Sequence, residues 1–267
     1  MSEPLHLGIS PCPNDTYIFY GLIEKTISLD GFDLNTTLLD IQELNEAALR
    51  QEFDLIKISV AACPHIRKNY RLLRAGAALG RGCGPLLVAR EKTSLERLRL
   101  ARVAIPGGLT TANLLLRKNG FHRGDILEMR YDLIMEAVCS GRAEAGLIIH
   151  EGRFTYPQYG LTKILDLGQW WEEETGLPIP LGAIVARRNL GQDFAAQAEQ
   201  GIRQSLDFSA KHLDQAWPFI REKAQEMDQA TIREHIQTFV TGFSRDLGDD
   251  GLRAIEGLLG LTAADLL

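Results

Sequence analysis

Segments typical of strands alternate with segments typical of helices along the chain as far as about residue 192. Apolar, β-rich runs at residues 5–9, 32–39 and 53–60 are separated by stretches with a helical apolar face, and the scheme recurs farther along. Such alternation is typical of mainly parallel sheets with helices on their faces. Beyond residue 192 the apolar residues recur only at helical spacing, which predicts three or four helices and no strand. The sequence therefore predicts an α/β fold that ends in a helical segment.

Two segments share one pattern, which consists of a helix end, a polar turn, an acidic residue and an apolar strand. They are residues 48–59 and 138–149, in which Asp54 and Glu144 hold the same place. The likeness is either a chance similarity between two strand–helix units or the mark of two similar lobes. In the second interpretation each lobe contributes one strand end to a shared cleft, because open α/β sheets bind ligands at the carboxyl ends of their strands.

A second pair of similar segments indicates where the chain would pass between two lobes. Residues 84–90 (GPLLVAR) and 182–188 (GAIVARR) each combine a glycine, an apolar strand and Ala-Arg, and we interpret them as paired linkers. The larger lobe is then expected to contain residues 1–89 and 184–267, and the smaller lobe residues 90–183, with a ligand cleft between them.

Composition excludes several classes of protein. The net charge of −6 and the lack of a long basic run argue against a nucleic-acid binder, which needs a basic face. The N-terminus (MSEPLHLGIS) has no basic segment followed by an apolar one, and no apolar run approaches the ~20 residues of a membrane helix. We therefore expect a cytoplasmic protein with no nucleic-acid or membrane partner. In that reducing compartment the four scattered cysteines are expected to be free thiols; they are Cys12, Cys63, Cys83 and Cys139. None of them lies in a motif typical of a catalytic nucleophile.

Two strand-to-helix turns are candidates for anion binding. Residues 105–113 (IPGGLTTAN) end a strand, free the backbone with two glycines and open a helix with Thr110 and Thr111. Backbone N–H groups and hydroxyls gathered at a helix start bind carboxylate or phosphate. This segment lacks the lysine of a Walker A loop, and a plain helix cap is the alternative. Residues 10–15 (SPCPND), which include Asn14, form a second helix start, for which a rigid capped turn is the alternative.

Polar residues also interrupt an apolar strand. Lys57 and Ser59 flank Ile58, and strand alternation places the two polar side chains on one face. A buried lysine is costly unless it is paired, so Lys57 is expected to pair with a carboxylate, to snorkel to solvent or to reach a ligand. Ser59 lies at the strand end, where a ligand can be hydrogen-bonded. A paired structural lysine and a turn serine are the alternative.

His150 follows the apolar strand at residues 145–149, so its side chain can face a cleft at the strand exit. The ordinary pKa of imidazole suits proton transfer near neutrality. A structural histidine is the alternative. No His-x-x-x-His pattern occurs, so a metal site is not expected, and no Gly-x-Ser-x-Gly occurs, which argues against a hydrolase triad.

Five segments taken together are more specific than any one motif. They are SPCPNDT at 10–16, GRGCGP at 80–85, TTA at 110–112, AGLIIHE at 145–151 and DLGQWW at 166–171. These segments resemble the 1,4-dihydroxy-6-naphthoate synthase family of the futalosine route to menaquinone, and the resemblance spans nearly the whole chain. It implies the two-lobed fold of the type 2 periplasmic binding proteins. It also implies conversion of cyclic dehypoxanthine futalosine to 1,4-dihydroxy-6-naphthoate.

The resemblance also implies roles for individual residues. The family's histidine, which is the proton acceptor, falls on His150, and its substrate-contact segments fall on residues 57–59 and on Thr110 and Thr111. Asn14 in the first helix start is a further candidate contact. The expected substrate is a small carboxylate, and no cofactor or metal is expected, because the forming aromatic system itself favours cleavage of the carbon–carbon bond.

Three alternatives remain open at the level of sequence. A chorismate dehydratase of the same pathway and fold would act on a related carboxylate. A non-catalytic solute-binding protein would carry an export signal or a lipidated N-terminal cysteine. A ligand-sensing regulatory domain would carry a DNA-binding helix pair, and it ranks last because the chain begins directly with a strand.

Overall fold

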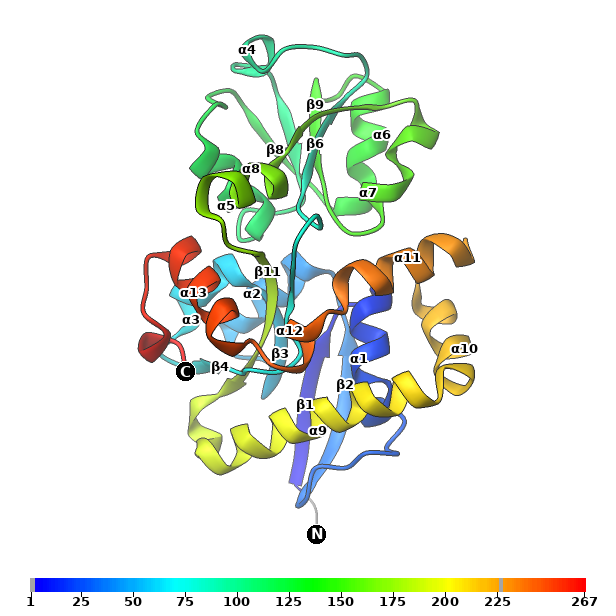
Figure 1. Cartoon of the computed structure of the whole chain (residues 1–267), viewed down its shortest axis with the longest axis vertical. Coiled ribbons are helices and arrows are strands. Elements are labelled where there is room, and N and C mark those ends of the chain that lie inside the picture. The colour runs from blue at the N-terminus through cyan, green and yellow to red at the C-terminus, as the bar shows by residue number, and fades with distance from the viewer. Residues whose placement is uncertain (1–2, 226–227) are drawn as a thin grey trace. The chain divides into compact units, whose positions relative to one another are not determined.

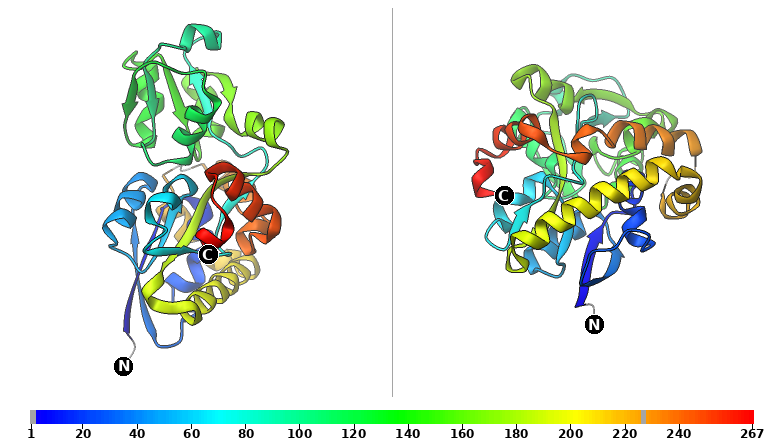
Figure 2. Two further views of the ribbon diagram at one scale, coloured as in Figure 1. Left: turned by 90° about the vertical axis from the view of Figure 1, so that its left-hand side faces the viewer. Right: turned by 60° about the horizontal axis from the view of Figure 1, so that its bottom comes forward.

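The computed structural model describes residues 3–225 and 228–267 and forms two compact units (Figure 1). Unit 1 combines both ends of the chain, Met1–Gly80 and Pro180–Leu267, and unit 2 is Arg81–Ile179. In each unit helices pack on the faces of one sheet (Figures 1 and 2).

The sheet of unit 1 is mixed. Its strand order is β2–β1–β3–β11–β4, and a sixth strand, β5, pairs with β11. The strands are β1 (Glu3–Ile9), β2 (Phe32–Leu38), β3 (Leu55–Ser59), β4 (Tyr70–Leu72), β5 (Ala78–Gly80) and β11 (Ile179–Arg187). Strand β1 is parallel to both β2 and β3, whereas β11 is antiparallel to β3 and to β4.

The sheet of unit 2 repeats this plan in the order β8–β7–β9–β6–β10. Its strands are β6 (Leu86–Ala89), β7 (Val103–Ile105), β8 (Ile126–Glu128), β9 (Ala145–Ile148) and β10 (Thr162–Asp166). Strand β7 is parallel to β8 and β9, and β6 is antiparallel to β9 and β10. Residues 86–89 were expected in the larger lobe as part of a linker, but they form a central strand of unit 2.

Both sheets are therefore mixed, whereas the sequence predicted mainly parallel ones. The difference comes from β6 and β11, which are the strands at the two passages of the chain between the units. A parallel pair needs a crossover connection, usually a helix, and the right-handed strand–helix–strand rule then fixes its direction. The chain enters β6 from β5 of unit 1 and enters β11 from the helix at Leu167–Thr175 of unit 2. Neither strand is therefore reached by a crossover within its own sheet, so each can pair antiparallel with its neighbour.

The acidic residues of the sequence repeat have the same role in both units. The backbone N–H of Asp54 donates to the carbonyl of His6 at 3.0 Å, and its carboxylate accepts from the N–H of His6 at 2.9 Å. Glu144 makes the same pair of bonds with Arg102, at 3.0 and 2.5 Å. Each acid thus fixes the register of a parallel strand pair, β1 with β3 or β7 with β9. The likeness between the two segments is therefore a structural repeat.

Apolar faces join the helices of unit 1 to its sheet. On one face α1 and α9 pack in one apolar cluster with Leu5, Leu7 and Ile9 of β1. On the other face Leu44 of α2 lies against Gly8, where a Cβ would come within 3.0 Å of it. These helices are α1 (Pro13–Ile23), α2 (Ile41–Arg50) and α9 (Gly191–Lys211).

The remaining helices complete the two units. The predicted helical end is present, but its described residues form five α-helices where the sequence predicted three or four. In unit 1, α9 is followed by α10 (Leu213–Lys223), α11 (Gln229–Phe239), α12 (Gly242–Arg245) and α13 (Gly248–Leu259). Unit 1 also contains the short α3 (Cys63–Ile66). Unit 2 contains α4 (Leu95–Leu98), α5 (Thr111–Asn119), α6 (Ile134–Cys139), α7 (Gly152–Thr155) and α8 (Leu167–Thr175).

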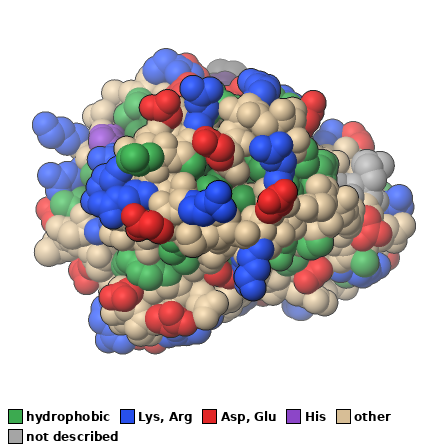
Figure 3. Space-filling model, turned by 90° about the horizontal axis from the view of Figure 1, so that it is seen from above, with side chains coloured by type: hydrophobic (Ala, Val, Ile, Leu, Met, Phe, Trp, Pro, Cys, Tyr) green, Lys and Arg blue, Asp and Glu red, His purple; other side chains and the backbone are tan. Residues whose placement is uncertain are grey.

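The surface carries charges of both signs. On the face in Figure 3, acidic and basic side chains are both spread among uncharged ones. Within the described part of the chain, no helix combines the length and the apolar character that crossing a membrane requires.

We expect Gly84→Ala to lower the free energy of unfolding by about 1–3 kcal/mol, the usual effect of forcing extra atoms into a packed site. A Cβ on Gly84 would overlap the backbone of Gly168 at the start of α8. The matched control is Gly242→Ala, because a Cβ there meets nothing within 4 Å. Chemical denaturation of both variants measures the difference, and equal stabilities would contradict the close approach.

Candidate active site

The carboxyl ends of β1 and β3 lie side by side in unit 1, because the two strands pair in parallel. Residues 10–16, which lead from β1 into α1, are therefore beside Ser59, the last residue of β3. We call residues 10–16 and Ser59 the unit 1 edge. Its polar side chains are buried rather than solvated: Ser10, Asn14, Asp15, Thr16 and Ser59.

The carboxylate of Asp15 is the centre of this edge. One oxygen, Oδ1, accepts from the ammonium of Lys57 at 2.7 Å and from Nδ2 of Asn14 at 2.9 Å. The other, Oδ2, accepts from the hydroxyl of Ser10 at 2.6 Å. The Ser10 hydroxyl oxygen in turn accepts from the backbone N–H of Cys12 at 3.3 Å, which fixes the turn before α1. Strand and helix start are thus joined through one buried acid.

Lys57 is the paired lysine that the sequence left as one of three alternatives. Its side chain is 4% exposed and that of Asp15 is 2% exposed, so the ion pair is buried. The ammonium also donates to the carbonyl of Gly76 at 3.3 Å. Ile58 is fully buried between the two predicted polar contacts, so its side chain belongs to the core. Whether residues 57–59 contact substrate stays a prediction.

Ser59 is held by an asparagine on α2. The amide of Asn45 donates to the Ser59 hydroxyl at 3.0 Å and accepts from the Ser59 backbone N–H at 2.8 Å. Asn45 is fully buried, although its neighbours on the same helix face are apolar. The two bonds fix both the backbone and the side chain at the end of β3.

Sequence reasoning did not assign three members of this network: Asp15, Asn45 and His235. His235 lies on α11, and its Nε2 is 3.0 Å from Oδ1 of Asn14, 221 residues away along the chain. Asn45 left a local signal, since it is a polar residue on the apolar face of a helix. His235 left none, because only the packing of α11 against α1 brings it to this edge.

The second candidate edge is in unit 2, where β7 and β9 pair in parallel. Residues 106–111 follow β7 and His150 follows β9, so the predicted helix start and the predicted base belong to the same end of one sheet. We call these residues the unit 2 edge. The structure thus places Asn14, Lys57 and Ser59 together in unit 1, and Thr110, Thr111 and His150 together in unit 2. The prediction that Ser59 and His150 face one cleft stays a prediction.

Thr110 shapes the loop at the unit 2 edge. It is the N-cap of α5, where its hydroxyl donates to the carbonyl of Gly107 at 2.8 Å and accepts from the N–H of Asn113 at 3.3 Å. Gly107 has a φ of 149°, which side chains rarely tolerate. The N–H of Gly108 donates to Glu128 at 3.0 Å. Thr111, the first residue of α5, is buried beside this cap.

His150 has an unusual backbone conformation. In the described part of the chain, three residues other than glycine have a positive φ: Lys25, Gln51 and His150. Lys25 and Gln51 lie just after helices, where the left-handed conformation commonly ends a helix. His150 instead follows a strand, with a φ of 53°. Its ring packs edge-on against Tyr131 at a centroid distance of 4.8 Å. Such local strain gathers at functional sites, which makes His150 the strongest candidate for chemistry.

Two of the four thiols are poorly suited to nucleophilic catalysis. Burial raises the pKa of Cys63 to about 12, and burial likewise raises the pKa of Cys83 to about 12. The reactive thiolate is therefore scarce near neutral pH at both positions. Within residues 3–225 and 228–267, no group of three or more His, Cys, Asp or Glu side chains is placed so that it could hold a metal ion.

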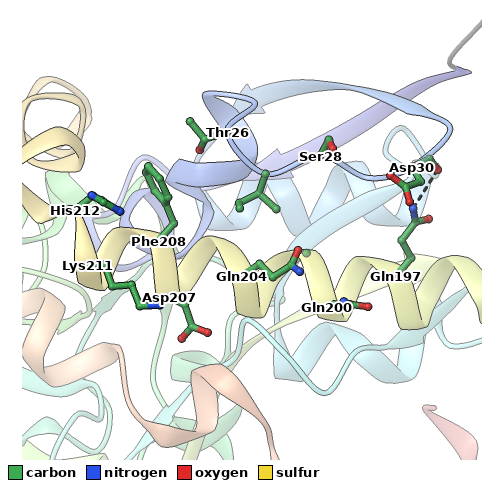
Figure 4. Close-up of a pocket in the computed structure, with 12 residues that line it drawn as sticks. Thr26, Ser28, Asp30, Gln197, Gln200, Gln204, Asp207, Phe208, Lys211 and His212 are labelled. Carbon is green, nitrogen blue, oxygen red and sulfur yellow. Dashed lines mark hydrogen bonds between the residues drawn. The ribbon is translucent and has the colours of Figure 1, made fainter.

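A hollow of about 660 Å³ lies elsewhere in unit 1, between α9 and the loop that precedes β2 (Figure 4). Its loop wall includes Asp30, whose carbonyl accepts from Gln197 of α9 at 3.0 Å. This loop leads into the amino end of β2, whereas the polar network lies at the carboxyl ends of β1 and β3. The hollow therefore contains none of the predicted site residues.

The two mixed sheets have matching strand orders, and in each a polar helix start follows a parallel strand, β1 or β7. This arrangement defines a protein with the periplasmic binding protein-like fold. The ligand-binding component of an ABC-type import system from Staphylococcus aureus, solved with zinc bound, matches at a TM-score of 0.73 and 13% identity, over 100% of this chain and 96% of that chain. Protein AF1704 from Archaeoglobus fulgidus matches at a TM-score of 0.90 and 31% identity, over 96% of this chain and 95% of that chain. The predicted fold class is confirmed.

Sequence comparison identifies the family. A family model described as menaquinone biosynthesis matches residues 5–264. A protein from Thermus thermophilus named 1,4-dihydroxy-6-naphthoate synthase is 47% identical over 257 residues, which cover 96% of this chain and 93% of that protein. The chain belongs to this family of menaquinone biosynthesis enzymes. The resemblance inferred from the five sequence segments is thereby confirmed.

We expect Lys57→Met to lower the free energy of unfolding by about 3–5 kcal/mol, because it leaves the carboxylate of Asp15 buried without its counter-ion. The matched control is Lys25→Met. Lys25 pairs with Asp33 at the surface, where the two side chains are 60% and 50% exposed, so its loss should change stability by about 0–1 kcal/mol. Urea denaturation followed by circular dichroism compares the two variants. If Lys57→Met lowers the free energy of unfolding no more than Lys25→Met does, the buried ion pair does not stabilise this edge.

Proposed function

We propose that the protein converts cyclic dehypoxanthine futalosine to 1,4-dihydroxy-6-naphthoate, with His150 as the general base. The observation that carries the proposal is the position of His150. His150 follows β9 at the same sheet edge as the Thr110–Thr111 helix start, and its backbone is in the left-handed conformation. Family membership supports the reaction, since the Thermus thermophilus relative carries the name of this synthase.

The proposed chemistry is a cleavage of a carbon–carbon bond in the retro-aldol sense. Neutral His150 removes the proton of a substrate hydroxyl, and the oxygen electron pair forms a carbonyl group. The bond between the future naphthoate and the sugar-derived fragment breaks, and its electrons pass into the developing aromatic system. The step is redox-neutral and the developing aromatic system takes up the electrons, so the proposal requires neither an electron-transfer cofactor nor a separate electron sink.

Substrate binding is assigned to both edges. A carboxylate or hydroxyl group of the substrate suits the start of α5, where backbone N–H groups and the positive helix end favour negative charge. Thr110 shapes this start and Thr111 is the proposed contact. Asn14, Ser59 and the backbone of residues 57–59 supply the contacts proposed in unit 1. Exclusion of water around the bound molecule would strengthen all of these hydrogen bonds.

We expect His150→Asn to lower kcat by about 10²–10⁴-fold, the usual contribution of a general base. Asparagine tolerates the left-handed backbone, so the variant removes the imidazole while it keeps the local conformation. The control is His122→Asn, because His122 bonds the carbonyl of Ala101 in a loop away from the unit 2 edge. Mass spectrometry of the product made from cyclic dehypoxanthine futalosine gives the rate.

This assay separates the proposal from its alternatives. Near-normal turnover by His150→Asn rejects the assigned base. Turnover of chorismate in place of the futalosine derivative identifies a dehydratase instead. A substrate that binds the wild-type protein and emerges unchanged identifies a non-catalytic binding protein, which the fold also supports.

We expect Ser59→Ala and Thr111→Val each to weaken binding of 1,4-dihydroxy-6-naphthoate by the equivalent of one hydrogen bond, about 0.5–1.5 kcal/mol. If both residues contact one molecule, the double variant should bind more weakly than either single variant. Isothermal titration measures the affinities, and thermal melts verify that each variant is folded. Titration curves identical to those of the wild type for both single variants reject the contact role.

A further inference from the structure

We propose that His235 is a positioning residue, which acts through Asn14 to hold the unit 1 edge in one defined arrangement. The inference rests on the proposed function only in that this edge binds the substrate. Three observations carry it: the order of donors and acceptors in the buried network, the place of Asn14 at the start of α1, and the complete burial of His235.

The hydrogen-bond network fixes which atoms carry hydrogens. The carboxylate of Asp15, paired with Lys57, can only accept, so the atom of Asn14 that lies 2.9 Å from it must be the amide nitrogen. The carbonyl oxygen of Asn14 is then the atom that lies 3.0 Å from Nε2 of His235. Because a carbonyl oxygen only accepts, Nε2 of His235 must carry the hydrogen. The chain of donors therefore runs from His235 to Asn14 and from Asn14 to Asp15.

The place of Asn14 connects this network to the site. Asn14 is the second residue of α1, directly after Pro13, and it lies beside the end of β3. Asn14 is 4% exposed, and each of the two polar atoms of its amide already has one partner, Asp15 or His235. Removal of either partner would leave a buried polar atom unpaired, which favours rotation of the amide into another position. The partner that comes from outside the edge is His235.

Simple packing does not explain why residue 235 is a histidine. The ring is fully buried and lies 4.6 Å from the ring of Phe239, on the buried face of α11 that also includes Ile232. A phenylalanine or leucine would fill such a place without burying polar atoms. An imidazole there is useful because it donates to the helix start at the edge. The helical end of the chain thus supplies part of the support of the site, although no residue of it was assigned to the site from sequence.

The test compares two replacements of His235. His235→Phe keeps a ring and removes the donor, and we expect it to raise KM for cyclic dehypoxanthine futalosine, and Kd for 1,4-dihydroxy-6-naphthoate, by about three- to tenfold, as for the loss of one neutral hydrogen bond. His235→Gln supplies an amide N–H and should restore most of the affinity. The fall in kcat should be smaller than the rise in KM. The control is His212→Phe, because His212 packs on Phe208 at the end of α9 and should leave both constants unchanged.

A double-mutant cycle tests whether His235 acts through Asn14. In the Asn14→Ala background, His235→Phe should have no further effect on Kd. A full additional loss in that background overturns the proposal, and so does wild-type affinity in His235→Phe. If His235→Gln is folded by its thermal melt but binds as weakly as His235→Phe, the role of the ring is packing, which also overturns it.

A spectroscopic readout separates this proposal from the proposed function. Nitrogen-15 spectra of the wild-type protein should show a slowly exchanging hydrogen on Nε2 of His235, and the side-chain amide signals of Asn14 should shift in His235→Phe. Neither result depends on turnover. Absence of both effects overturns the positioning role even if the enzyme is active, whereas failure of the product assay with both effects present rejects only the proposed reaction.

Discussion

The buried ion pair between Lys57 and Asp15 is the interaction on which the unit 1 edge depends. A charge inside a protein is tolerated only when a partner and further hydrogen bonds satisfy it. Lys57 comes from a strand and Asp15 from the first turn of a helix, so the pair joins the two elements that meet at the candidate site. Ser10 and Asn14 are then held because they complete the hydrogen bonding of the same carboxylate. The polar groups of this edge are buried and satisfy one another's hydrogen bonds, which favours a single arrangement.

The two units fix the register of their parallel strands in the same way. In each, an acidic residue bonds the backbone of the neighbouring parallel strand and so fixes which strand ends come together. The chemistry placed at those ends differs between the units. Unit 1 has a network of paired side chains, whereas unit 2 has a capped glycine loop beside a strained histidine. The two edges therefore carry different chemistry on one shared scaffold.

The fold alone does not distinguish a binding protein from an enzyme. The import component from Staphylococcus aureus has the same architecture at 13% identity, and that protein is a ligand-binding component. In the present chain an imidazole follows strand β9 in the left-handed backbone conformation, which residues other than glycine adopt uncommonly. His150 and family membership therefore favour catalysis, whereas the two helix starts favour ligand binding.

Local sequence determined the parts of this protein that depend on neighbouring residues. Periodicity and short motifs predict the α/β alternation, the helical end, the Thr110 cap and the position of His150 after a strand. The sequence also shows the repeat around Asp54 and Glu144, but not its role in fixing strand register. Tertiary structure decided the rest: the antiparallel entry of β6 and β11, the partner of Lys57, and the contact of His235 with Asn14 across 221 residues. The reason is physical. Helix and strand patterns are set over a few residues, but a buried polar atom is satisfied by whichever group packing brings to it, and that group can lie anywhere in the chain.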